Sequence, residues 1–150
     1  MCGRFSLGDV KTINRKYGLN IVPNYNISPS SQIFIKTDKV FSRKWSFSPN
    51  WASTPLNIIN ARYETLENRS TFRPLLQNRC LIPATAYFEW RKDGHKRLKN
   101  RIAPLDKSII TFAGLYSEGN FVIVTCPPAP IISHIHKRMP LLINPSERED

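Results

Sequence analysis

Two reactive groups would lie on adjacent carbons if the initiator methionine were removed from this chain, which begins Met1-Cys2-Gly3. Cysteine is small, so we expect methionine aminopeptidase to remove Met1 and leave Cys2 as the first residue. A terminal cysteine is a 1,2-aminothiol. Its amine condenses with an aldehyde to give an imine, and its thiol then closes a thiazolidine ring. From these residues alone, a cysteine that packs as a small hydrophobic residue is an equally good interpretation.

Three further stretches place polar side chains among apolar or aromatic neighbours. Glu89 interrupts the aromatic run YFEW, and a desolvated carboxylate there would have a raised pKa that suits proton transfer near neutral pH. His136 stands just before an Arg-Met-Pro corner, and its ordinary pKa suits acid–base catalysis. Asn60 and Arg62 are two residues apart, so their side chains share a face of an extended segment. Each has an ordinary alternative: a surface carboxylate, a solvated loop histidine, and a capping asparagine beside a surface arginine.

Positive charge is the strongest feature of the composition. Lys and Arg number 22 against 11 Asp and Glu, a net charge of +11, which attracts polyanions and makes nucleic acid the first partner to consider. Trp45, Trp51 and Trp90 lie near basic residues, where aromatic rings either stack on unpaired bases or pack in the core. The run RKDGHKRLKNR carries six Lys or Arg among eleven residues. It predicts either a phosphate-contacting flap or a solvated hairpin.

Length and cysteine content narrow the class of protein. A chain of 150 residues predicts one domain, residues 1–150. No apolar run reaches the length of a membrane span and no signal sequence is evident. We therefore expect no membrane contact and a location in the cytoplasm or nucleoid, or in the nucleus of a eukaryotic host. Cys2, Cys80 and Cys126 form no CxxC pair. We expect no metal, no cofactor and a monomer.

Local patterns predict an α+β fold made of short elements. The expected fold is a single β-rich domain, with a curled or barrel-like, mostly antiparallel sheet flanked by a few short helices. The patterns predict helices over 9–17 and 65–77, a helical turn over 129–135, hairpins over 32–47 and around Asp93-Gly94, a strand with a proline break over 80–91, a β pair of 108–116 with 120–126, and a final strand over 139–143.

Taken together, the motifs resemble one family. The stretches MCGRF, YNISPS, NARYET, FRPLLQNRCLIPATAYFEW and HKRMP occur in an order similar to that of the SOS response-associated peptidase (SRAP) family, whose members process abasic sites in DNA. The resemblance spans most of residues 2–143. It departs at WSFSPNW, where members often have WGL-x-P-x-W, and at Thr85-Ala86, where an Asp-Gly pair is common. These departures leave the reacting groups in place.

The resemblance implies a specific reaction and partner. The partner would be single-stranded DNA, or a junction of single- and double-stranded DNA, that contains abasic sites. Cys2 would link to the C1′ aldehyde of the ring-opened sugar as a thiazolidine, with lyase activity as a side reaction. Glu89 would transfer protons, His136 would assist ring opening and reversal, and Asn60 would position the terminus or the sugar. The DNA-binding residues implied are Arg4, Pro29, Trp45, Arg62, Trp90 and Arg138.

Two other functions stay open at this point. One is a cysteine peptidase or N-terminal-nucleophile hydrolase that uses Cys2 with His136. The other is a non-catalytic protein that binds single-stranded DNA. The net charge and the aromatic residues among basic ones favour the abasic-site reaction over the hydrolase.

Overall fold

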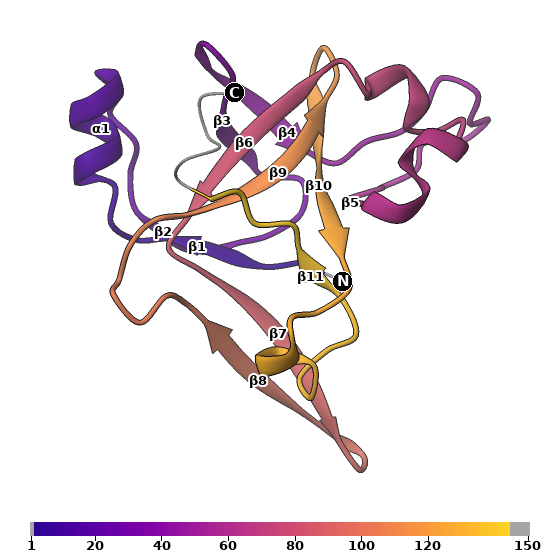
Figure 1. Ribbon diagram of the computed structural model, residues 1–150. Helices are drawn as coiled ribbons and strands as arrows, with labels where there is room; N and C mark the ends of the chain where they lie inside the picture. The colour runs from indigo at the N-terminus through magenta and orange to yellow at the C-terminus, as the bar shows by residue number, and fades with distance from the viewer. Residues whose placement is uncertain (1, 145–150) are drawn as a thin grey trace.

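A closed barrel organises most of the chain in the computed structural model, which describes residues 2–144 (Figure 1). Its five strands are β3 (Gln32–Lys36), β4 (Val40–Trp45), β6 (Arg79–Ala84), β9 (Ile110–Tyr116) and β10 (Asn120–Cys126). They follow the order β10-β4-β3-β6-β9, and β9 pairs with β10 to close the ring. All pairings in the ring are antiparallel except that of β10 with β4. The expected β-rich, barrel-like and mostly antiparallel fold is confirmed.

A smaller sheet extends below the barrel and carries the start of the chain (Figure 1). Its order is β2-β1-β7-β8, formed by β2 (Asn24–Ile27), β1 (Phe5–Leu7), β7 (Ala86–Asp93) and β8 (Lys96–Ile102). The predicted hairpin at Asp93-Gly94 joins β7 to β8, and Gly94 has φ +60°. Glycine adopts this left-handed conformation without steric penalty. The hairpin projects away from the barrel as a two-stranded ribbon.

Two short strands attach to β10. The strand β5 (Asn60–Arg62) runs parallel to β10, and β11 (Met139–Pro140) runs antiparallel to it. Since β5 and β11 both pair with β10, which is one of the barrel strands, the NAR motif and the RMP corner lie in the same region. The final strand was predicted over 139–143, but only Met139–Pro140 form a strand. Leu142 adds an isolated bridge to Phe112.

Helices are short, as expected, and one prediction was wrong. Helix α1 (Lys11–Tyr17) ends at Gly18, which has φ +65°. The helix predicted over 65–77 is instead two 3-10 helices, η1 (Tyr63–Asn68) and η2 (Arg73–Leu75). Proline has no N–H and its ring clashes with the preceding turn, so Pro74 fits in the first turn of η2 but would break a helix that continued through it. The predicted turn over 129–135 contains η3 (Pro130–Ile132).

The strand predicted over 80–91 is also two strands. The segment divides between β6 and β7, which belong to different sheets, and the break falls at Thr85 rather than at Pro83. The Thr85 N–H donates to the carbonyl oxygen of Ser6 at 2.7 Å, and its hydroxyl accepts the Gly8 N–H at 3.0 Å. These bonds to β1 and to the residue that follows it turn the chain out of the barrel. They depend on residues almost 80 positions away, which local patterns do not reveal.

Aromatic rings fill the space between the barrel and the smaller sheet. Phe5 packs against Trp45 at 5.2 Å and against Phe112 at 5.6 Å between ring centroids. Cys2 belongs to the same buried cluster. Burial of these rings stabilises the end of the chain against the barrel, because each large apolar side chain contributes about 1.5–3 kcal/mol when removed from water. No helix within residues 2–144 is long and apolar enough to cross a membrane.

Candidate active site

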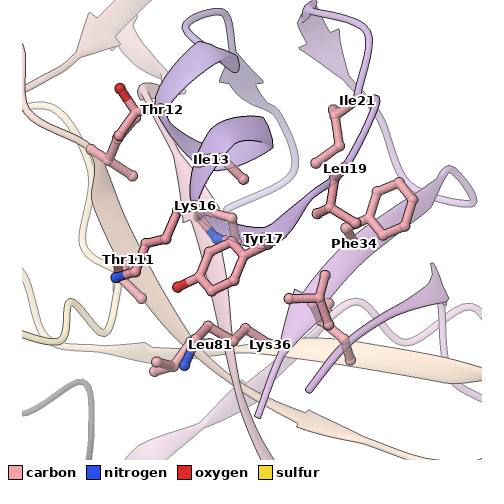
Figure 2. Close-up of a pocket in the computed structure, with 14 residues that line it drawn as sticks. Thr12, Ile13, Lys16, Tyr17, Leu19, Ile21, Phe34, Lys36, Leu81 and Thr111 are labelled. Atoms are coloured by element: carbon pink, nitrogen blue, oxygen red, sulfur yellow. The ribbon is translucent and has the colours of Figure 1, made fainter. Parts of the chain in front are cut away.

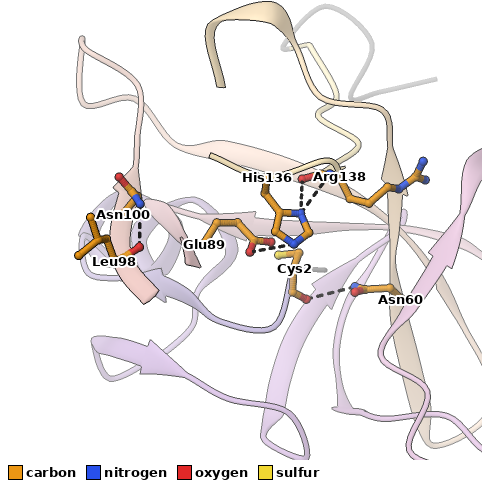
Figure 3. A network of polar contacts seen from close by, with 7 residues as sticks. All are labelled: Cys2, Asn60, Glu89, Leu98, Asn100, His136 and Arg138. Atoms are coloured by element: carbon orange, nitrogen blue, oxygen red, sulfur yellow. Dashed lines mark hydrogen bonds and ion pairs between the residues drawn. The ribbon is translucent and has the colours of Figure 1, made fainter. Parts of the chain in front are cut away.

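Cys2 lies at the centre of a buried polar cluster (Figure 3). The residue has no exposed surface, and its carbonyl oxygen accepts a hydrogen bond from Asn60 Nδ2 at 3.2 Å. Asn60 comes from β5, 58 positions along the chain. Its Nδ2 also donates to the carbonyl oxygen of Ile59 at 3.0 Å. The side-chain amide is thereby oriented toward the main chain of Cys2.

Glu89 and His136 face each other on the other side of Cys2 (Figure 3). Glu89 comes from β7, His136 precedes β11, and Glu89 Oε2 lies 3.8 Å from His136 Nε2. Burial raises the pKa of Glu89 above its usual value of 4.5 and lowers the pKa of His136 below 6.5. At neutral pH the histidine is therefore neutral, and the carboxyl group titrates closer to neutrality than an exposed one.

The main chain after His136 determines which ring nitrogen carries its proton. The Arg138 N–H donates to His136 Nδ1 at 3.1 Å. The Arg138 carbonyl oxygen also lies 3.3 Å from Nδ1. Because a backbone N–H can only donate, the shorter contact favours Nδ1 as the acceptor of the neutral ring and Nε2 as the nitrogen that carries the proton. That N–H is directed toward the Glu89 carboxyl group. The neutral histidine thus presents an N–H to Glu89, which stabilises the carboxylate form when Glu89 gives up its proton.

Arg138 secures this loop through an ion pair with Glu64, whose side chain is exposed, and its role in DNA binding stays a prediction. Its guanidinium donates to Glu64 Oε2 at 2.6 Å and to Oε1 at 3.0 Å, and also to the Thr125 hydroxyl at 3.1 Å. Arg138 is only 7% exposed. Its charge is already matched by Glu64, whose pKa this hydrogen bond lowers. These contacts place the side chain to hold the loop of His136.

Trp45 was also predicted to line the DNA groove, and the structure shows that it is a core residue. The side chain is fully buried, its ring stacks on Phe121 with centroids 6.3 Å apart, and its Nε1–H donates to the carbonyl oxygen of Ile59 at 3.1 Å. An indole enclosed in this way cannot stack on a base. The adjacent Lys44 misled the interpretation, because neighbouring side chains along a strand point to opposite faces.

The remaining DNA-binding candidates stay predictions, and the structure places them at the surface around the cluster. Arg62 is exposed at the end of β5, and Pro29 is half-buried after β2. Arg4 Nη1 donates to Asn26 Oδ1 at 3.2 Å. Trp90 is half-buried and follows Glu89 on β7, so its side chain lies on the opposite face of that sheet.

Three residues near the cluster were not predicted. Glu64 and Thr125 bind Arg138, and nothing in their local sequence indicates it. Tyr87 is buried, and its hydroxyl has no hydrogen-bond partner among the described residues. Burial, with the nearby Cys2 and Glu89, raises its pKa. The sequence could have indicated that Tyr87 lies on the same face as Glu89, since residues two apart on a strand share a face.

The arrangement defines a class of site: a residue at the start of the chain, buried against a carboxyl group, a neutral histidine and an oriented amide. Residues 2–144 contain no group of three or more His, Cys, Asp or Glu side chains that could hold a metal ion. The chain belongs to the SOS response associated peptidase (SRAP) family, whose family model matches residues 1–150.

Individual relatives support this assignment. The abasic site processing protein YoqW of Bacillus subtilis is 30% identical over 177 residues, which include all of this chain and 79% of that protein. The abasic site processing protein YedK of Escherichia coli is 30% identical over 174 residues, covering 97% of this chain and 76% of YedK. A crystal structure of a Bacteroides thetaiotaomicron protein has a similar fold, with a TM-score of 0.86 at 23% identity, over 99% of this chain and 79% of that one.

Proposed function

We propose that this chain captures abasic sites in single-stranded DNA by a covalent bond to Cys2, after Met1 has been removed. The observation that carries the proposal is the meeting of Cys2 with Asn60, Glu89 and His136, which come from four separate segments. The relatives named as abasic site processing proteins support the choice of DNA as the substrate.

The proposed reaction needs no oxidant or reductant. The neutral α-amine of Cys2 attacks C1′ of the ring-opened sugar, and the carbonyl oxygen takes up a proton to become a hydroxyl group. That group leaves as water while the nitrogen forms an imine to C1′. The thiol sulfur then bonds to C1′ and its proton passes to the nitrogen, which completes the thiazolidine. One water molecule is released overall. The amine has to be free, because an acylated nitrogen is not nucleophilic.

The surrounding groups fit the proton transfers of this scheme. With its pKa raised by burial, Glu89 can donate a proton to the leaving hydroxyl group and can take one from the amine. The N–H of His136 Nε2, 3.8 Å from Glu89 Oε2, stabilises the carboxylate that forms when Glu89 donates its proton. The Oδ1 atom of Asn60 has no hydrogen-bond partner among the described residues, so it can accept a hydrogen bond from the amine or from a sugar hydroxyl.

The hydrolase alternative is less well supported. A cysteine peptidase needs a thiol with a lowered pKa, because the thiolate is the nucleophile. In the chain that carries Met1, burial raises the pKa of the Cys2 thiol to about 12, and the carboxylate of Glu89 adds to the effect. Ring closure on an imine makes no such demand, since the imine carbon is already activated.

The experiment that tests the proposal is a denaturing gel of the tag-free protein with single-stranded DNA carrying one abasic site. Mass spectrometry first confirms that the protein begins at Cys2. We expect a shifted band that survives heating. Cys2→Ala retains an α-amine but cannot close the ring, so we expect its adduct to survive only after borohydride reduction.

Two controls make the result specific. Cys126→Ser changes a half-buried thiol that the proposed reaction does not use, and it should leave the shifted band intact. A chain with an N-terminal tag has an acylated Cys2 nitrogen and should give no band. Full capture by the tagged chain would rule out the thiazolidine step.

A further inference from the structure

A pocket lies between α1 and the barrel, away from the cluster around Cys2 (Figure 2). Its volume is about 360 Å³, and its walls come from α1, the segment after it, and β3, β4, β6 and β9. None of the lining residues belongs to the candidate active site. In Figure 1, α1 lies at one side of the molecule and the start of the chain at the other. The pocket is therefore separate from the candidate active site.

The pocket joins an apolar interior to two positive charges. Its interior is formed largely by aliphatic side chains, with Ile13, Leu19 and Leu81 among them. Lys16 and Lys36 reach it from different elements, and their Nζ atoms lie 5.4 and 5.8 Å from the ring centroid of Tyr17. No acidic side chain is among the lining residues that the structure describes. Two ammonium groups converge on one ring without a carboxylate, which favours an anionic ligand.

We propose that this pocket binds an acidic peptide segment of a partner protein, which inserts an aliphatic or aromatic side chain and places its carboxylates against Lys16 and Lys36. Apolar walls with a few placed polar groups are typical of ligand sites. A nucleic-acid base would bury its polar edge against aliphatic side chains and lose its hydrogen bonds to water. The charge and the walls together therefore favour a peptide over DNA.

The strands beside the pocket favour a peptide over a fatty acid. β3 and β6 share a single paired position, Lys36 with Leu81, so the two strands diverge there. An extended peptide can hydrogen-bond to main chain at such a seam, which a hydrocarbon chain cannot do. A peptide held here would leave the cluster around Cys2 accessible, so that one molecule can hold a partner protein and DNA together.

The test uses fluorescence anisotropy of the full chain with a fluorescein-labelled peptide, DEDELF. Two matched peptides, DEDESS without the apolar residues and NQNQLF without the charges, should each bind about tenfold more weakly or worse. Lys16→Glu and Lys36→Glu should each weaken DEDELF binding by about tenfold, because a like charge replaces an attractive one. Lys11→Glu makes the same charge change on an exposed position of α1 outside the pocket and should leave binding unchanged.

Thermal melts confirm that the three lysine variants are folded, and all three should retain capture of abasic DNA. Failure of DEDELF to bind would overturn the proposal, as would equal binding to the variant that combines Lys16→Glu with Lys36→Glu. Competition distinguishes the other occupants. Displacement of DEDELF by an oligonucleotide without abasic sites, or by decanoate at lower concentration than unlabelled DEDELF, would assign the pocket to nucleic acid or to lipid instead.

Discussion

Glu89, to which the proposed reaction assigns the proton transfers, is buried at a cost in stability. Its side chain is only 3% exposed, on a strand whose neighbouring side chains are aromatic. Burial disfavours the carboxylate, so the folded protein binds a proton at pH values where the unfolded chain has released it. A group with a raised folded pKa stabilises the fold at low pH, and that contribution is lost as the pH rises through the folded pKa.

We predict that Glu89→Gln makes the protein more stable at pH 7.5 by about 1 kcal/mol, because the neutral amide removes a buried charge. The gain should disappear near pH 4.5, the ordinary pKa of the carboxyl group, where Glu89 is itself protonated in the fold. Urea unfolding of both proteins at the two pH values measures the difference in their free energies of unfolding. The same variant should form the DNA adduct about 100-fold more slowly. Equal gains at the two pH values would show that the charge is not responsible.

At the scale of elements, the loop between η3 and β11 presents His136, and Arg138 anchors that loop. The anchor connects three elements: Glu64 in η1, Thr125 in β10 and the loop itself. Arg138 is a positioning residue, because its guanidinium binds Glu64 and Thr125 while its backbone N–H orients the histidine ring. A buried arginine that loses its partner is strongly destabilising.

Glu64→Gln separates this role from DNA binding by Arg138. A neutral partner weakens the anchor, so we predict that covalent capture slows by about threefold to tenfold while affinity for plain single-stranded DNA stays the same. Gel kinetics and anisotropy measure the two quantities. If Arg138 instead bound a DNA phosphate, removing the competing carboxylate of Glu64 would strengthen DNA binding. Glu67→Gln, an exposed carboxylate in the same 3-10 helix, is the matched control.

At the scale of the whole molecule, one face of the smaller sheet gathers positive charge beside aromatic rings. Antiparallel pairing places Lys99 opposite Trp90 and Arg101 opposite Phe88. The Lys99 ammonium lies 4.5 Å from the centroid of Phe88 and 5.8 Å from that of Trp90. This face lies on the other side of β7 from Glu89. Its cations and rings suit the backbone and bases of single-stranded DNA.

Non-covalent binding to single-stranded DNA should therefore fall steeply with salt, because each neutralised phosphate releases counterions. We predict that Lys99→Ala and Arg101→Ala each reduce the slope of log affinity against log salt by about 0.7, whereas Lys39→Ala in the exposed turn between β3 and β4 does not. Anisotropy with an unreactive oligonucleotide from 50 to 300 mM salt, a range of about sixfold, measures the slope. An unchanged slope in both variants would place the DNA elsewhere.

Local sequence was sufficient for the chemical identity of the candidate site and for much of the fold. Cys2 is next to the initiator methionine, Glu89 interrupts an aromatic run, and Asn60 lies in the short NAR motif. The Asp93-Gly94 turn and the α1 stop at Gly18 follow from backbone preferences of single residues. Such features depend on covalent neighbours, so the sequence alone determines them.

Burial and pairing were decided only by the tertiary structure. Local sequence does not distinguish Trp45, which is enclosed in the core, from Trp90, which reaches the surface. Local sequence does not reveal the ion pair of Arg138, because its partner Glu64 stands 74 positions away. The division of 80–91 into β6 and β7 depends in the same way on hydrogen bonds from Thr85 to Ser6 and Gly8. Burial and pairing depend on the free energies of interaction between groups that only the folded chain brings together.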